Sequence, residues 1–182
     1  RLEELAQQQF RSLRRILGNP RLLVQGPAGS GKTMIALYAA RERAERGEKV
    51  LILCYNKLLA HWLRLQVKGT SIVADSFHGY CSSRVPNFGR RLQDATNAKV
   101  FWTHTAADLL FDEVAGDEDD SKKFDTIFID EAQDYDDSWW AAIQFLLRDP
   151  DHGRLYLFGD PNQLLFGAEK SYPKSVVDGG IY

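Results

Sequence analysis

Residues 26–33 read Gly26-Pro27-Ala28-Gly29-Ser30-Gly31-Lys32-Thr33 and stand between a short apolar segment and a stretch of helix-forming residues. The run fits the pattern G-x-x-x-x-G-K-[ST], and a strand before it and a helix after it are the setting in which that pattern binds phosphate. Glycines let backbone N–H groups turn towards phosphate oxygens, and the helix N-terminus adds a favourable dipole. Lys32 would place its charge on the β- and γ-phosphates, and the Thr33 hydroxyl would bind Mg²⁺. The run therefore predicts a phosphate-binding loop; the alternative is a glycine-rich turn without a ligand.

Strand and helix patterns alternate along the rest of the chain. Strands are predicted for residues 21–25, 49–54, 71–74, 126–129 and 154–158, all of them short and mostly apolar. Helices are predicted for residues 2–17, 33–46, 58–65, 106–114 and 138–147. This alternation favours a three-layer α/β fold, in which helices cover both faces of a parallel sheet. Such sheets bind ligands at the carboxyl ends of their strands, and the motifs considered below follow directly after strands.

The composition fits one globular domain of 182 residues. The formal net charge is −2, so nucleic acid would have to bind through a local surface and not through an overall positive field. Two cysteines, Cys54 and Cys81, match no metal-ligand spacing and no disulfide framework, which favours a reducing cytoplasmic location. No apolar run is long enough to span a membrane. Residues 84–91 are predicted to be loop-like, and the acidic run at residues 117–120 is predicted to be a solvated loop.

A pair of adjacent acids follows the predicted strand at residues 126–129. Asp130, at the strand tip, can hold Mg²⁺ opposite Thr33, and Glu131 can orient and deprotonate a water molecule for attack on the γ-phosphate. A small-molecule kinase activates the hydroxyl of its substrate and has no general need for this second acid. The pair therefore favours ATP hydrolysis, with Lys32, Asp130 and Glu131 as catalytic residues and with ATP and Mg²⁺ as ligands.

The order of these motifs resembles the first RecA-like domain of superfamily 1 helicases, the UvrD-like group. The resemblance is closest to bacterial helicase-like proteins that often carry a nuclease-related domain. The segment DEAQD, residues 130–134, resembles the second motif of the group, and GDPNQ, residues 159–163, resembles its third. The resemblance implies that Gln163 senses the γ-phosphate and couples the state of ATP to a bound strand. Gln9 resembles an N-terminal glutamine whose amide reads adenine, and the two glutamines before it leave the register open.

Two further segments resemble the single-strand contacts of that group. The segment CYNK is similar to the usual F-T-N-K, with Tyr55 in place of threonine, and SFH is similar to the usual T-F-H. In sequence-tolerant binding, hydroxyl, amide and ammonium groups hold phosphates while aromatic rings stack on bases. The alternative role for the aromatic rings and the histidine is core packing, which is the role expected of Trp139 and Trp140. The candidates for nucleic-acid contact are Asn56, Lys57, Ser76, Phe77, His78 and Phe166.

The resemblance covers nearly the whole chain but only half of a motor. It implies one RecA-like ATP-binding domain over residues 1–182, helicase domain 1A, with a short insert near residues 83–120. The second RecA-like domain, which supplies arginines to the transferring phosphoryl group, is expected to be absent, so the chain alone is expected to hydrolyse little ATP. The expected partners are that second domain and single-stranded nucleic acid, DNA more than RNA. Two alternatives stay open: a nucleic-acid-responsive switch that hydrolyses ATP without unwinding, and a module that binds ATP without hydrolysing it.

Overall fold

The chain forms a parallel sheet, described here from a computed structural model that covers residues 18–117, 119–160, 162 and 172–180. Five strands lie in the order β1-β5-β4-β2-β3, and every pairing between neighbours is parallel. Their bounds are β1 Arg21–Gln25, β2 Val50–Cys54, β3 Val73–Ser76, β4 Thr126–Ile129 and β5 Arg154–Gly159. The predicted strands are confirmed, with β3 displaced by two residues towards the C-terminus.

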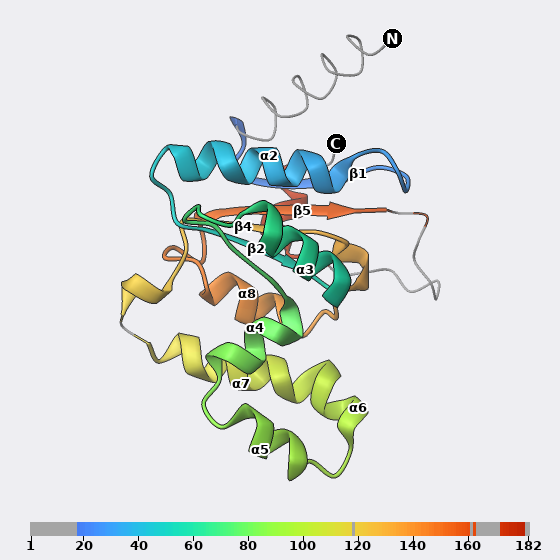
Figure 1. The fold of residues 1–182 in the computed structure, drawn as a ribbon, viewed down its shortest axis with the longest axis vertical. Coiled ribbons are helices and arrows are strands. Elements are labelled where there is room, and N and C mark those ends of the chain that lie inside the picture. Colours follow the sequence, from blue (N-terminus) through green and yellow to red (C-terminus); the bar gives the residue numbers. More distant parts are fainter. Residues whose placement is uncertain (1–17, 118, 161, 163–171, 181–182) are drawn as a thin grey trace.

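Helices cover both faces of the sheet (Figure 1). One face packs against α2 (Lys32–Glu45) and α3 (Lys57–Gln66). The other packs against α4 (Phe77–Arg84), α7 (Ala106–Ala115) and α8 (Trp139–Phe145). Successive residues of β2 alternate between the two cores and are all fully buried, as expected for a strand in the middle of a parallel sheet. The predicted three-layer α/β fold is confirmed.

The segment near residues 83–120 is largely helical, which corrects the loop predicted for residues 84–91. The structure places α5 (Phe88–Gln93), α6 (Ala98–Val100) and a π-helix, η1 (Phe101–Thr105), between α4 and α7. The Phe88 side chain is 3% exposed, and its ring centroid lies 5.2 Å from that of Phe101. Aromatic packing thus orders a segment whose helices are too short to show a hydrophobic period in the sequence.

The acidic run near residue 117 is only in part the solvated loop that was predicted. Asp117 accepts hydrogen bonds from Arg84 at 2.9 Å and from Lys122 at 3.1 Å, and its side chain is 13% exposed. The N–H of Asp119, followed by Lys122 and Arg84, lowers the pKa of the Asp117 carboxyl. Asp120 begins a 3₁₀ turn, η2 (Asp120–Lys122). Through the ion pair between Asp117 and Arg84, the acidic run therefore connects the end of the insert to α4.

Two more short elements are described: η3 (Ala132–Asp134), a 3₁₀ turn that follows β4 near the candidate site, and α9 (Lys174–Val177), which lies beside β1 and contacts Arg21 at its start. Cys54 and Cys81 are buried and not joined in a disulfide, as the sequence predicts. Among the described helices, none combines the length and the apolar character that a membrane-spanning segment needs.

Candidate nucleotide site and nucleic-acid face

The candidate residues meet at one edge of the sheet because the strands are parallel and their carboxyl ends point the same way. The strand order then fixes the order of the motifs along this edge. The ends of β1, β5 and β4 carry the glycine-rich loop, Asp160 and the acidic pair, which together are called the ATP side below. The ends of β2 and β3 carry residues 55–57 and 76–78, called the nucleic-acid side.

The glycine-rich loop has the backbone conformation that its sequence predicts. Gly29 and Gly31 have φ angles of 76° and 86°, in the left-handed region that side chains disfavour. Gly31 is the N-cap of α2, so the first turn of this helix opens directly from the loop. The Gly26 N–H donates to the Gly159 carbonyl at 3.2 Å, which holds the start of the loop against the end of β5. Pro27, Ala28, Gly29 and Ser30 are exposed, so their backbone is open to a ligand.

Lys32 lies inside this loop. Its residue is 8% exposed, and its ammonium group donates to the carbonyls of Gly26 at 2.7 Å and Pro27 at 3.0 Å. Both acceptors belong to the loop itself. The positive charge is therefore held at the place where the loop would surround a phosphate, on contacts that a phosphate oxygen can replace.

Asp130 is almost completely buried, with 1% of its surface exposed. Its Oδ1 accepts the N–H of Glu131 at 3.0 Å, whereas its Oδ2 has no hydrogen-bond partner in the described part of the chain. Burial raises the pKa of the Asp130 carboxyl, and the Thr33 side chain and the charge of Lys32 oppose that rise. An unsatisfied buried carboxylate oxygen is unfavourable for the fold unless a ligand completes it.

The oxygen atoms of Asp130 and Thr33 fit a magnesium ion bound together with nucleotide. Mg²⁺ prefers hard oxygen ligands and is usually held by one or two protein groups, with waters and phosphates completing its octahedron. Within the described residues no cluster of three or more His, Cys, Asp or Glu could hold a metal by protein ligands alone. The buried Asp130 Oδ2 is thus the atom that points to such an ion.

Glu131 follows in a left-handed backbone conformation, with φ 53°. For a residue with a Cβ this conformation is disfavoured by about 1–2 kcal/mol. The carboxylate is held by Gln133, whose Nε2 donates to Glu131 Oε2 at 2.6 Å. Gln133 Oε1 in turn accepts the N–H of Asp160 at 3.1 Å. Sequence reasoning assigned no role to Gln133, although an amide two residues after the candidate acid pair was a signal that could have found it.

Three predicted residues lie outside the residues that the structure describes: Gln9, Gln163 and Phe166. Asp160 and Asn162, which precede Gln163 in the sequence, belong to the described residues. Asp160 is 3% exposed, and its Oδ1 accepts the N–H of Asn162 at 2.9 Å. The roles of the three residues therefore stay predictions.

On the nucleic-acid side, two polar candidates cap helices. Asn56 Oδ1 accepts the N–H groups of Leu58 at 2.8 Å and Leu59 at 3.3 Å at the start of α3. Ser76 Oγ accepts the N–H of Gly79 at 3.1 Å at the start of α4, and Ser76 is 2% exposed. Side chains in these positions satisfy backbone groups that the helix itself leaves unpaired. Lys57 is exposed and Tyr55 is 46% exposed.

Phe77 is a core residue in this structure, with 0% exposure. Its ring stacks on Trp139, with centroids 4.3 Å apart and an interplanar angle of 10°. It also meets Tyr135 edge-on, at 5.9 Å. No face of the Phe77 ring is open to a base, so the expectation that it stacks on nucleic acid is corrected to a packing role. Trp139 and Trp140, at 2% and 5% exposure, pack in the core as predicted.

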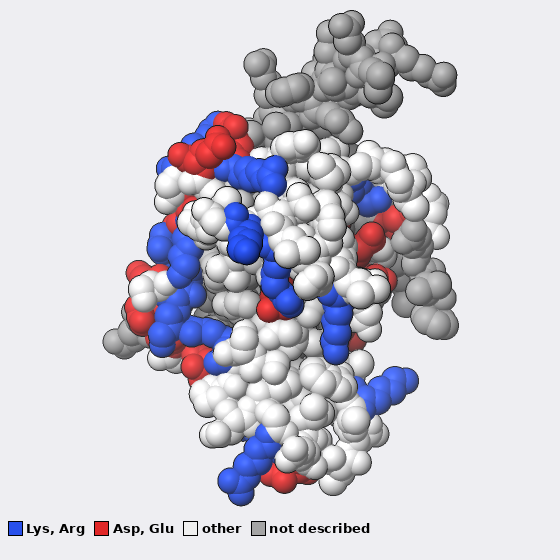
Figure 2. Space-filling model, viewed as in Figure 1, with Lys and Arg blue, Asp and Glu red and all other residues white. Residues whose placement is uncertain are grey.

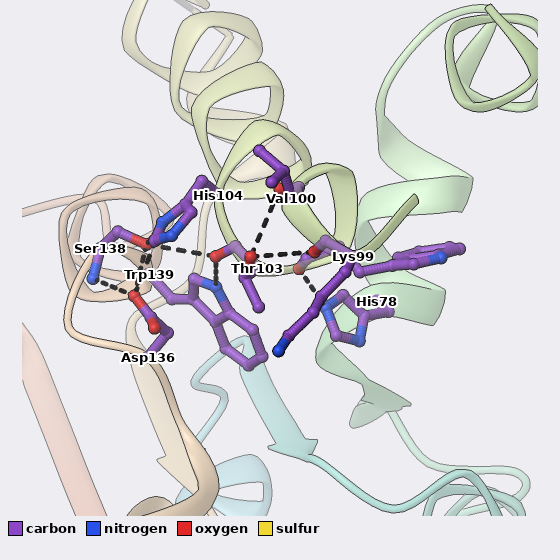
Figure 3. Close-up of polar contacts among 9 residues, drawn as sticks. His78, Lys99, Val100, Thr103, His104, Asp136, Ser138 and Trp139 are labelled. Atoms are coloured by element: carbon purple, nitrogen blue, oxygen red, sulfur yellow. Dashed lines mark hydrogen bonds and ion pairs between the residues drawn. The ribbon is translucent and has the colours of Figure 1, made fainter. Parts of the chain in front are cut away.

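His78 and Trp139 both form hydrogen bonds with backbone carbonyls of η1, the π-helix of the insert (Figure 3). His78 Nε2 donates to the Trp102 carbonyl at 2.8 Å, and Trp139 Nε1 donates to the next carbonyl, that of Thr103, at 2.6 Å. Burial lowers the pKa of His78, the charge of Lys57 lowers it further, and the Trp102 carbonyl opposes both. The folded state therefore favours the neutral form of His78, whose ring joins the first turn of α4 to the insert.

The charges are dispersed over the side of the molecule shown in Figure 2, which includes α2 and α3 above and α4, α5 and α7 below. Lys and Arg side chains are spread over this face, while Asp and Glu are fewer and lie mostly towards its margins. Several of the cations are paired, such as Arg64 with Asp75 at 2.7 Å. The face thus offers individual cations and not one continuous basic patch, in keeping with the net charge of −2.

Comparison with known families agrees with this geometry. The family model AAA_19, described as "AAA domain", matches residues 9–169, which is most of the chain. No curated protein matches the chain. The match does not bear on the nuclease-related domain that the sequence resemblance suggested. The chain belongs to the AAA_19 family, a family of P-loop ATPase domains associated with superfamily 1 helicases.

Proposed function

We propose that this chain is the ATP-binding and ATP-hydrolysing domain of a superfamily 1 helicase or single-strand translocase, acting on DNA in preference to RNA. The observation that carries the proposal is the buried Asp130 at the sheet edge, whose Oδ2 has no hydrogen-bond partner within the geometric limit among the described residues, while Thr33 and Lys32 act on its pKa. The nucleic-acid side lies on the same edge, at the ends of β2 and β3, and β2 is the direct neighbour of β4. Nucleotide and strand would therefore bind side by side on one rigid sheet.

In this proposal Lys32 opposes the charge of the β- and γ-phosphates, and Thr33 and Asp130 hold Mg²⁺. When bound, the ion neutralises phosphate charge as the γ-phosphoryl group transfers. Glu131 accepts a proton from the attacking water while the bond between the γ-phosphorus and the bridging oxygen breaks, and ADP and inorganic phosphate are the products. Gln163 would sense the γ-phosphate, and Gln9 or one of its two neighbours would read adenine.

The proposal includes a second RecA-like domain in the same parent protein, because an arginine from such a domain accelerates phosphoryl transfer by several orders of magnitude. The present chain would be domain 1A, with residues 83–120 as its insert. Exposed Lys57, together with Asn56, is the part of the nucleic-acid side best placed to hold strand phosphates.

The test is Glu131→Gln in a protein that contains both RecA-like domains. The substitution keeps the side chain's size and removes the base, so kcat for ATP hydrolysis should fall by about 10²–10⁴ while ATP affinity is kept. Glu45→Gln is the matched control, because Glu45 is exposed near the C-terminal end of α2, away from the loop. Its kcat should equal that of the wild type.

The outcomes also separate the alternatives. A Glu131→Gln protein with wild-type function would reject hydrolysis and leave the ATP-binding module. If the wild type hydrolyses ATP in response to single strands but displaces no strand from a duplex, the switch is the better description. Stimulation by an RNA oligonucleotide above that by DNA of equal length would overturn the preference for DNA.

A further inference from the structure

Gln133 is a buried amide, 4% exposed, that lies between two parts of the ATP side. Its Nε2 donates to Glu131 Oε2 at 2.6 Å, and its Oε1 accepts the N–H of Asp160 at 3.1 Å. We propose that Gln133 is a positioning residue, which fixes the Glu131 carboxylate relative to the backbone of Asp160, the first residue after β5. The inference rests on the proposed function, since it assigns Glu131 the role of base.

The first contact fixes the orientation of the base. Glu131 starts from a left-handed backbone conformation, φ 53°, that aims its side chain away from the direction an extended strand would give. The bond from Gln133 uses one carboxylate oxygen, Oε2, and is short because its acceptor is charged. Oε1 is then the oxygen that can take a proton from water, in an orientation set by the amide.

The second contact reaches the neighbouring strand. Asp160 is the first residue after β5 and stands three positions before Gln163 in the sequence. Its N–H is buried and bonded to Gln133, and its own carboxylate fixes the N–H of Asn162 at 2.9 Å. A displacement of Asp160 would therefore move the Gln133 amide and, through it, the Glu131 carboxylate.

The backbone around Gln133 is built for this close approach. A Cβ at Gly159 would lie 3.1 Å from Gln133 Oε1, so a side chain there would press on the amide. The Gly159 carbonyl also accepts the N–H of Gly26. The end of β5 is thus joined on one side to the phosphate loop and on the other, through Gln133, to the base.

A carboxamide can make both contacts because it offers a donor and an acceptor on one planar group without carrying a charge. Methionine has nearly the same length and offers neither. Glutamate has the same shape, but its ionised form only accepts hydrogen bonds and would place a second negative charge against Glu131. These two variants therefore break the same bridge for different chemical reasons.

The experiment measures steady-state ATP hydrolysis by Gln133→Met and Gln133→Glu in the protein with both RecA-like domains. We expect kcat to fall about tenfold or more in both, with KM within twofold of the wild type. Gln144→Met is the control, because Gln144 is a partly buried amide on α8 that contacts Arg21 and the Trp140 carbonyl. Its kcat should be unchanged.

A double mutant distinguishes positioning from simple support of the fold. If Gln133 acts through Glu131, then Gln133→Met should add less than a twofold loss of kcat in a Glu131→Gln background. A tenfold further loss in that background, or a Gln133→Met protein with wild-type kcat, would overturn the inference. So would parallel changes of kcat, KM and thermal midpoint in both variants, which are the mark of a structural role. A wild type without hydrolysis would overturn the proposed function as well, whereas an active wild type and an unimpaired Gln133→Met would overturn this inference alone.

Discussion

The ATP side and the nucleic-acid side of the sheet edge carry similar polar residues, but they differ in what the polar atoms contact. On the ATP side, Asp130 Oδ2 is buried without a hydrogen-bond partner in the described part of the chain, and the Lys32 ammonium group donates to two carbonyls of its own loop. On the nucleic-acid side, Ser76 and His78 are engaged in hydrogen bonds that hold helices in place. The ATP side thus has a buried polar atom that a ligand could satisfy, whereas Ser76 and His78 on the nucleic-acid side already have partners within the fold.

The difference has opposite consequences for stability. A buried polar atom without a partner disfavours the folded state by about 1–3 kcal/mol, which ligand binding can recover. A helix cap favours the folded state by about 1 kcal/mol, and a ligand that took over the capping side chain would lose that contribution. Nucleic acid is therefore expected to contact exposed groups such as Lys57 first and to leave Ser76 in its cap. Substitutions on the two sides should change stability in opposite directions.

Among the substitutions that compare the two sides, the largest effect is expected for Asp130→Asn, which should weaken Mg²⁺-dependent ATP binding at least tenfold and yet stabilise the free protein by about 1 kcal/mol. The substitution removes a buried charge and keeps an oxygen that can accept the Glu131 N–H. The pKa of Asp130 is raised in the folded state, so the charged form opposes folding above that pKa. The gain should be full at pH 8 and should shrink as the pH falls towards 3.8, the ordinary value for Asp. Urea unfolding without nucleotide measures it.

Asp108→Asn is the control for Asp130→Asn, because Asp108 is exposed on α7. It should leave both stability and nucleotide affinity within experimental error. A loss of stability in Asp130→Asn would mean that the carboxylate is satisfied in the free protein, and the contrast between the two sides would disappear.

The sequence predicted most of what depends on local pattern. Strands such as residues 126–129 were found because a strand buried on both faces is a short apolar run bounded by polar residues. The phosphate loop was found because its chemistry fixes glycines, a lysine and a threonine at set spacing. The displacement of β3 has a different origin, since its register is set by pairing with β2, in which Val73 lies opposite Leu51. That pairing extends the strand over the polar Asp75 and Ser76, which the apolar pattern left out.

Contacts between distant segments could not be predicted in the same way. The bond from His78 to Trp102 spans a sequence separation of 24 residues, and the bond from Asp160 to Gln133 spans 27. The sequence around either residue gives no indication of its distant partner. The burial of Phe77 against Trp139 likewise depends on how α8 returns to the sheet. Motif resemblance proposed candidates on the nucleic-acid side but could not tell which of their atoms already form contacts within the fold.

A smaller effect, of opposite sign to that of Asp130→Asn, is expected for Ser76→Ala. The substitution removes the acceptor for the Gly79 N–H at the start of α4, so the protein should lose about 1 kcal/mol of stability. Ser82→Ala is the matched control, because Ser82 is exposed in the same helix, where alanine is a slightly better helix former. Urea unfolding and affinity for a short single-stranded oligonucleotide should both be measured. A Ser76→Ala protein of wild-type stability but weaker strand binding would show that the hydroxyl serves nucleic acid and not the cap.

The smallest expected effect concerns the pH dependence of stability and is tested with His78→Gln. Burial and the charge of Lys57 lower the pKa of His78 below its ordinary value of 6.5, so the folded state favours the neutral ring. The stability that this neutral ring contributes is complete above pH 6.5 and is lost as the pH falls through the lower pKa of the folded state. Glutamine can place its Nε2 where the imidazole Nε2 donates to the Trp102 carbonyl, and it does not titrate.

Urea unfolding of both proteins at pH 8, 7, 6 and 5 should therefore show a steeper acid loss for the wild type than for His78→Gln. The other three of the four histidines, His61, His104 and His152, are present in both proteins, so their titration cancels in the difference between the two curves. Parallel curves would mean that His78 keeps its ordinary pKa and that its bond to the insert survives protonation. In that case the fold would not depend on the neutral form of His78. Below pH 6.5 His78 could then contact a strand phosphate as a cation, and the contrast with the ATP side would be weaker.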